Sequence, residues 1–167
     1  MGERALAAVK GQDTTLWYYS QWGGSDDVVQ DMFSSTSPDE ILTNLHWQFL
    51  GHGPLESANK IIDTLTTEMF YLISPARIFV CVPLWFGLGL SDSSLLSDSG
   101  LLVPISSTDS FKTVQTALHN LKRVLFDAVT EKQLPLRVAT QCLKYVCRLL
   151  RQQQFQFHCM ENLYIRW

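Results

Sequence analysis

The residues of this chain that fit nucleophilic catalysis are one serine, two histidines and an acid. Ser20 would be the nucleophile, His46 or His52 its base, and Asp39 the group that orients the histidine. The segment 18–22 around the serine lacks the two glycines of a G-x-S-x-G nucleophile elbow. We therefore expect Ser20 to be a solvent-facing strand residue, and a hydrolase is a secondary alternative.

The same histidines raise the question of a metal site, with His158 and Cys159 as further ligands. Zinc requires three or four convergent nitrogen or sulfur ligands. His46 and His52 lie six residues apart and would diverge on one continuous helix, unless the chain breaks at Gly51. We expect His46 on a helix surface and His52 in a loop, with no metal and no cofactor; a metal enzyme is the other form of the secondary alternative.

A basic stripe runs along the last predicted helix at 4-3-4-3 spacing, formed by Arg137, Gln141, Lys144, Arg148 and Arg151. Such a surface would neutralise phosphates and bind nucleic acid in a salt-dependent way. Lys112, His119, Lys122 and Arg123 would extend it from the preceding helix. No nucleic-acid motif accompanies the stripe, so a solvated helix face is favoured and nucleic-acid binding is the first alternative.

Aromatic side chains form the other candidate surface, and most of them lie in the segment 14–22. Alternate residues of a strand share a face, so Trp17 and Tyr19 point away from Tyr18 and Ser20. One face must belong to the core, and the other exposes aromatics or is covered by a helix or a partner. Packing within the chain explains these residues slightly better; as a binding surface, the candidates are Trp17, Tyr19 and Trp22.

The elements that position these residues begin with strands. Alternating, β-branched and aromatic segments predict a hairpin that turns at residues 11–13, followed by three later strands, one of which contains Pro83. A proline inside a strand implies an edge position or a bulge. The expected strands are 4–9, 14–22, 68–74, 77–86 and 100–105.

Helix signals occupy the remaining segments. Ser37 and Pro38 predict the start of a helix that runs to about Leu50, residues 26–33 fit two helical turns, and residues 55–65 are ambiguous. Asp109 is the expected N-cap of the first C-terminal helix, and Pro135 begins the second. Their predicted buried stripes are Phe111, Val114, Leu118, Leu121, Leu125 and Ala128 in the first, and Val138, Cys142, Val146 and Leu149 in the second.

The order of these elements separates strands from helices, which favours an α+β fold. We predict one domain over residues 1–167, with an antiparallel or mixed sheet of about five strands and two C-terminal amphipathic helices packed against it. Residues 91–99 are expected to be a mobile loop, and residues 152–167 a divergent tail.

Composition indicates a globular protein, with 46% hydrophobic and 17% charged residues. The longest apolar run, residues 78–90, is too short to cross a bilayer as a helix, which takes about 20 residues. No signal-peptide pattern and no C-x-x-C pair is present, so we expect a cytoplasmic protein without membrane contact. Acidic residues dominate 1–100 and basic residues dominate 101–167, which we interpret as complementary packing.

Several short segments of the chain form a recognisable set. They are Gly2-Glu3-Arg4-Ala5-Leu6, Tyr19-Ser20-Gln21-Trp22-Gly23, Glu68-Met69-Phe70-Tyr71-Leu72, Leu84-Trp85-Phe86-Gly87-Leu88 and Gly100-Leu101-Leu102-Val103. Together they resemble a family of small uncharacterised haloarchaeal proteins. The resemblance implies a cytoplasmic protein with a domain of unassigned function, and it carries over no catalytic residue. The near balance of 16 acidic and 13 basic residues departs from the acid excess of proteins from salt-saturated cytoplasm.

The sequence as a whole favours a non-enzymatic intracellular binding or accessory protein. The binding residues would come from the aromatic hairpin, with a protein partner, or from the basic residues Arg137, Lys144, Arg148 and Arg151. No catalytic residue is assigned.

Overall fold

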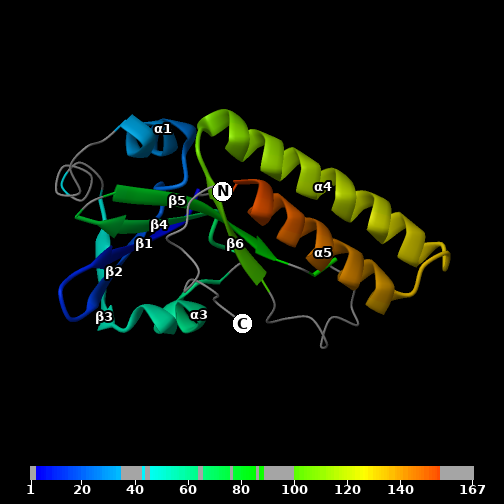
Figure 1. Ribbon diagram of the computed structural model, residues 1–167, viewed down its shortest axis with the longest axis horizontal. Coiled ribbons are helices and arrows are strands. Elements are labelled where there is room, and N and C mark those ends of the chain that lie inside the picture. The colour runs from blue at the N-terminus through cyan, green and yellow to red at the C-terminus, as the bar shows by residue number, and fades with distance from the viewer. Residues whose placement is uncertain are drawn as a thin grey trace.

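The computed structural model of the chain describes residues 3–34, 43, 46–63, 66–75, 77–85, 87–88 and 100–154. Its strands form one mixed sheet in the order β3-β2-β1-β4-β5-β6 (Figure 1). β1 pairs with β4 in parallel, and the other neighbouring strands are antiparallel. The α+β fold is therefore confirmed, with one strand more than expected. The strands are β1 (Ala5–Lys10), β2 (Thr15–Ser20), β3 (Gln48–Gly53), β4 (Met69–Ser74), β5 (Arg77–Trp85) and β6 (Gly100–Ile105).

The additional strand, β3, corrects the helix expected to run as far as Leu50. Gln48–Gly53 pairs with β2, with Gly51 opposite Trp17 and Phe49 opposite Tyr18. The start of that expected helix, residues 37–42, lies outside the described residues. Local capping signals predict a helix only weakly, and here the cross-strand pairing with an aromatic strand decides the conformation.

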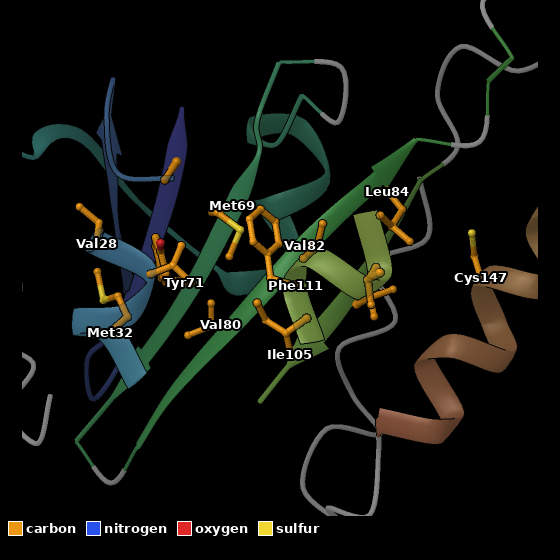
Figure 2. Close-up of a cluster of buried hydrophobic side chains, with 14 of the residues drawn as sticks. Val28, Met32, Met69, Tyr71, Val80, Val82, Leu84, Ile105, Phe111 and Cys147 are labelled. Carbon is orange, nitrogen blue, oxygen red and sulfur yellow. The ribbon is translucent and has the colours of Figure 1, made fainter. Parts of the chain in front are cut away.

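Each face of the sheet carries a cluster of buried apolar side chains. The larger core cluster lies between one face and three helices, α1 (Asp26–Ser34), α4 (Thr108–Thr130) and α5 (Leu136–Gln154). Figure 2 shows part of this cluster, including Tyr71, Val82 and Phe111. A smaller cluster on the other face packs against the 3-10 turn η1 (Leu55–Ser57) and α3 (Ala58–Ile61). Alternation along β1 and β4 divides their residues between the two clusters.

Pro83 sits in β5, which lies inside the sheet between β4 and β6. Its ladder to β4 ends at the pair of Phe70 with Cys81, so Pro83 lies beyond the last residue paired with that strand. On the β6 side the register continues through Pro83 and Leu102 without a bulge. The conflict between proline and a central strand is resolved because the strand is locally an edge at this position.

The helix α4 begins with a capping box that the sequence interpretation missed. Ser107, not Asp109, is the N-cap: its hydroxyl accepts a hydrogen bond from the Ser110 backbone N–H at 3.1 Å, and Ser110 Oγ accepts one from the Ser107 N–H at 3.0 Å. The predicted apolar stripe of α4 is confirmed, since Phe111, Val114 and Leu125 are buried and its other members are partly buried.

The buried stripe of α5 differs from the predicted one. Ala139, Leu143 and Cys147 face the core, whereas Val138, Cys142 and Leu149 are exposed; Val146, the fourth predicted residue, is half-buried. Two apolar stripes with helical spacing lie side by side on this helix, and contact with the sheet selects one of them. Residues 152–154 of the expected tail form the end of α5, and the rest of that tail and the expected loop 91–99 lie outside the described residues.

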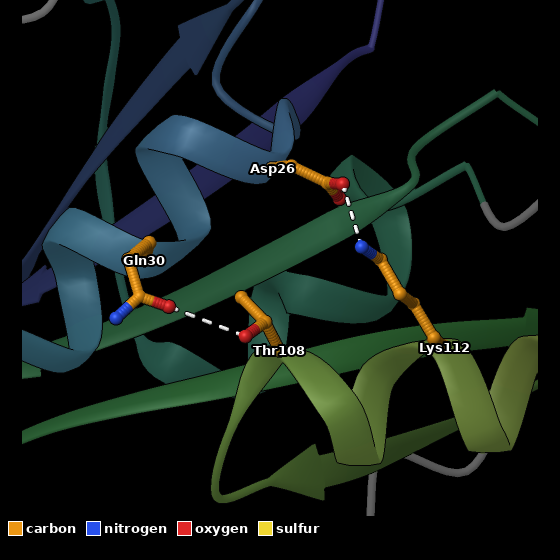
Figure 3. A network of polar contacts seen from close by, with 4 residues as sticks. All are labelled: Asp26, Gln30, Thr108 and Lys112. Carbon is orange, nitrogen blue, oxygen red and sulfur yellow. Dashed lines mark hydrogen bonds and ion pairs between the residues drawn. The ribbon is translucent and has the colours of Figure 1, made fainter.

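Polar contacts join α1 to the start of α4 (Figure 3). Lys112 Nζ lies 3.0 Å from Asp26 Oδ2, and Thr108 Oγ1 donates a hydrogen bond of 3.2 Å to Gln30 Oε1. Both contacts are exposed, so they orient the two helices more than they stabilise them. No helix of the described residues combines the length and apolar character that crossing a membrane requires.

Candidate functional site

The edge strand β3 carries two exposed apolar side chains. Among the described strands it pairs only with β2, and Phe49 and Leu50 are 54% and 48% exposed. Edge strands of natural sheets usually carry charges or prolines that prevent further pairing. Within Gln48–Gly53 there is neither an Asp, Glu, Lys or Arg nor a proline. We call Trp22, Phe49 and Leu50 the aromatic edge.

A bulge in β3 accounts for the exposure of Leu50. The register passes from the pair Trp17 with Gly51 to the pair Tyr18 with Phe49, so Leu50 is the additional residue. Gly51 has a φ of 145°, a value that side chains disfavour, and thus permits the irregular backbone beside Leu50. The bulge leaves a large apolar side chain without a cross-strand partner.

Three aromatic residues pack beneath the edge strand, namely Tyr18, Trp47 and Tyr71, and we call them the aromatic base. The rings of Phe49 and Tyr18 meet edge to face at 5.5 Å, and those of Trp47 and Tyr71 at 6.0 Å. Tyr71 Oη donates a buried hydrogen bond of 2.7 Å to the carbonyl oxygen of Gly23. Burial raises the pKa of the Tyr71 phenol, so it stays protonated as a donor. Phe49 in β3 therefore packs against a residue of β2, and Trp47, just before β3, packs against a residue of β4.

Trp22 belongs to the aromatic edge by position and exposure. It is largely exposed and follows the end of β2 at which β3 begins, because Tyr19 pairs with Gln48. The next residue, Gly23, lies so close to Trp47 that a Cβ atom there would be 3.2 Å from the indole. The chain after Trp22 is thus held against the same aromatic base.

The other two aromatic candidates from the sequence lie elsewhere. Trp17 is 2% exposed, and its ring packs 6.4 Å from that of Phe70 in the smaller core cluster. Its assignment to an exposed binding surface is therefore wrong, since the face it shares with Tyr19 is covered by η1 and α3. Tyr19 is half-buried at the margin of that cluster, and its Oη donates a hydrogen bond of 2.5 Å to Gln21 Oε1.

The candidate hydrolytic and metal residues do not converge in the described part of the chain. Ser20 is buried opposite Ala5, which corrects its expected solvent-facing position. His46 precedes β3 and His52 lies within it, both exposed, in place of the expected helix and loop. Asp39, His158 and Cys159 lie outside the described residues, and within those residues no three His, Cys, Asp or Glu side chains are grouped as metal ligands.

The basic stripe is present on α5, with Arg137, Gln141 and Arg148 exposed and Lys144 half-buried. Arg151 lies in α5, but its side chain is outside the described part.

Two cations of the expected extension on α4 are engaged within the chain. Lys112 pairs with Asp26, and Lys122 Nζ lies 4.9 Å from the centre of the Trp85 ring. Burial lowers the pKa of Lys122. Lys122 is half-buried, whereas Lys112, His119 and Arg123 are exposed.

Sequence interpretation missed Phe49 and Leu50 as functional candidates because it placed them at the end of a helix. A signal was present: Trp47, Phe49, Gly51 and Gly53 alternate as strand residues do, and glycines are common at bulges.

Comparison with known proteins adds no relative. No family model matches the chain, and neither a curated protein nor a solved structure matches it. The likeness to the haloarchaeal family therefore stays a prediction.

Proposed function

We propose that this protein is a binding module that takes up an extended segment of a partner protein along β3. The observation that carries the proposal is the strand β3, which among the described strands pairs only with β2, contains neither an Asp, Glu, Lys or Arg nor a proline, and exposes Phe49 and Leu50. In such strand addition, the outer N–H and C=O groups of the edge supply affinity, and side-chain contacts supply specificity. The chemistry that fits is an extended peptide with apolar side chains on alternate residues.

The aromatic base supports a preformed site. Tyr18 contacts the ring of Phe49, and Tyr71 contacts that of Trp47, which lowers the side-chain entropy that Phe49 and Trp47 would lose when a partner binds. Aromatic residues, Phe included, are enriched in protein interfaces, and Trp is among the residues that contribute most to binding.

An intracellular setting is part of the proposal. Cys142 and Cys147 are thiols, and Cys147 is fully buried as a small apolar side chain. Such cysteine usage is typical of proteins in a reducing compartment.

The experiment is a selection of extended peptides from a random displayed library on the immobilised full chain, followed by titration of the selected peptides. Phe49→Ser and Leu50→Ser should each weaken binding by about tenfold or more. Val124→Ser is the matched control, because Val124 is an exposed apolar residue on α4, at 60% slightly more exposed than Phe49 and Leu50. Peptides that bind all three variants as tightly as the original chain would refute the proposal.

A further inference from the structure

The helix α5 presents three faces, of which packing against the sheet uses one. Ala139, Leu143 and Cys147 face the core. The basic stripe forms a second face. The third face is apolar and exposed, with Tyr145 at its centre, 62% exposed. We call this third face the outer seam; it consists of Val138, Cys142, Tyr145 and Leu149.

The spacing of the outer seam is that of a helix–helix contact. Its four residues recur at intervals of four, three and four positions, which is the a/d pattern of a coiled coil. A stripe of this kind forms knobs that fit the holes of one facing helix. A flat partner surface or a nucleic-acid backbone has no need of such a repeat.

The charge beside the outer seam specifies the partner further. Each seam residue is directly preceded by a residue of the basic stripe, namely Arg137, Gln141, Lys144 and Arg148. The stripe therefore runs along one side of the seam over its whole length. Two copies of α5 packed antiparallel on their seams would bring the neutral Gln141 of one copy against Arg148 of the other. A second copy therefore supplies no carboxylate to the basic stripe, whereas an acidic helix does.

We propose that the outer seam docks an acidic amphipathic helix of another protein. Apolar residues of that helix would fill the spaces around Tyr145 and Leu149, and its flanking carboxylates would lie beside the exposed Arg137 and Arg148. This surface lies on a different element from β3 and concerns a helical partner rather than an extended one, so it goes beyond the function proposed above.

The probe is a synthetic three-heptad helical peptide of about 21 residues, with Ile and Leu on its seam and Glu on both flanks. Its fluorescence anisotropy is followed as the full chain is added. The matched control peptide carries Lys in place of every Glu. We expect the acidic peptide to bind, and the basic peptide to bind at least about tenfold more weakly.

Variants of the chain connect that binding to the outer seam. Tyr145→Glu and Arg148→Glu should each lower the affinity for the acidic peptide by about tenfold or more. Phe49→Ser on β3 should leave that affinity unchanged. Since Tyr145 and Arg148 are exposed, these variants should fold, which circular dichroism checks. If Phe49→Ser abolishes selected-peptide binding but not helix binding, the two surfaces are independent.

Three results would overturn the inference. The first is that the acidic peptide fails to bind, or binds no better than the control peptide with Lys in place of Glu. The chain sediments as a dimer that Tyr145→Glu dissociates, which assigns the seam to a second copy. Single-stranded nucleic acid binds with a steep salt dependence, is lost in Arg148→Glu and competes with the acidic peptide, which assigns the face to phosphates.

Discussion

Tyr71 Oη donates a 2.7 Å hydrogen bond to the carbonyl oxygen of Gly23, joining β4 to the segment that follows the aromatic hairpin. The bond is buried, and the Tyr71 ring also meets Trp47 edge to face. A single core residue thus connects three segments that are remote in sequence: the centre of the sheet, the chain after β2 and the start of β3. The proposed binding edge depends on the rigidity of this junction.

Tyr71→Phe should therefore destabilise the protein while keeping the ring contact. The variant leaves the Gly23 carbonyl without its buried donor, and we expect a loss of about 1–2 kcal/mol in the free energy of unfolding. Urea titration measures it. Tyr145→Phe is the control, because its hydroxyl belongs to an exposed side chain, and it should change stability by less than about 0.5 kcal/mol. Equal effects of the two changes would contradict the role given to Tyr71.

The orientation of α5 gives a second prediction. Leu143 is fully buried and Leu149 is exposed. Leu143→Ala should lower the free energy of unfolding by about 2–5 kcal/mol through lost burial and a cavity, whereas Leu149→Ala should cost less than about 1 kcal/mol. Thermal unfolding of both variants measures the two losses. A larger loss for Leu149→Ala than for Leu143→Ala would mean that the stripe predicted from the sequence is the buried one.

Thiol reactivity should distinguish the same two faces. Burial raises the pKa of the Cys147 thiol to about 11, so roughly one molecule in a thousand holds the thiolate at pH 8. Cys142 is exposed. With iodoacetamide at pH 8, mass spectrometry should find Cys142 alkylated rapidly and Cys147 only after unfolding. Rapid labelling of Cys147 in the folded chain would place it at the surface.

The same pKa makes stability depend on pH. An unfolded thiol ionises near pH 8.5, whereas the folded Cys147 holds its proton to about pH 11. The folded state then binds more protons between these values, so its stability should fall as pH rises from about 8.5 towards 11. Cys147→Ala should show a shallower decline in melting temperature over this interval. An identical decline would mean that other groups produce it.

Much of the fold could be predicted from the sequence because its signals are local. The turn at Gly11, whose N–H donates to the Thr14 carbonyl at 2.9 Å, lies between two strongly β-forming segments. The stripe from Phe111 to Ala128 repeats often enough to fix both the helix and its buried side. Each of these patterns points to one structure.

The errors arose where local patterns allow two structures. Residues 48–53 end a plausible helix and also alternate as a strand, and pairing with Tyr18 and Trp17 decides between them. On α5, the predicted stripe through Cys142 and the buried one through Leu143 both have helical spacing, and contact with the sheet decides between them. The candidate surfaces consist of apolar residues that the core does not bury. Which residues these are depends on the tertiary packing, so the sequence alone did not identify them.

The central claim, that β3 receives an extended partner segment, is tested most directly by amide hydrogen exchange. A library-selected peptide is added to the full chain, and exchange is compared with and without it. The account predicts slower exchange confined to Gln48–Gly53 and its immediate neighbours, and no such change in the Phe49→Ser variant. Protection that appears on α4 or α5 while β3 exchanges as before would contradict the claim.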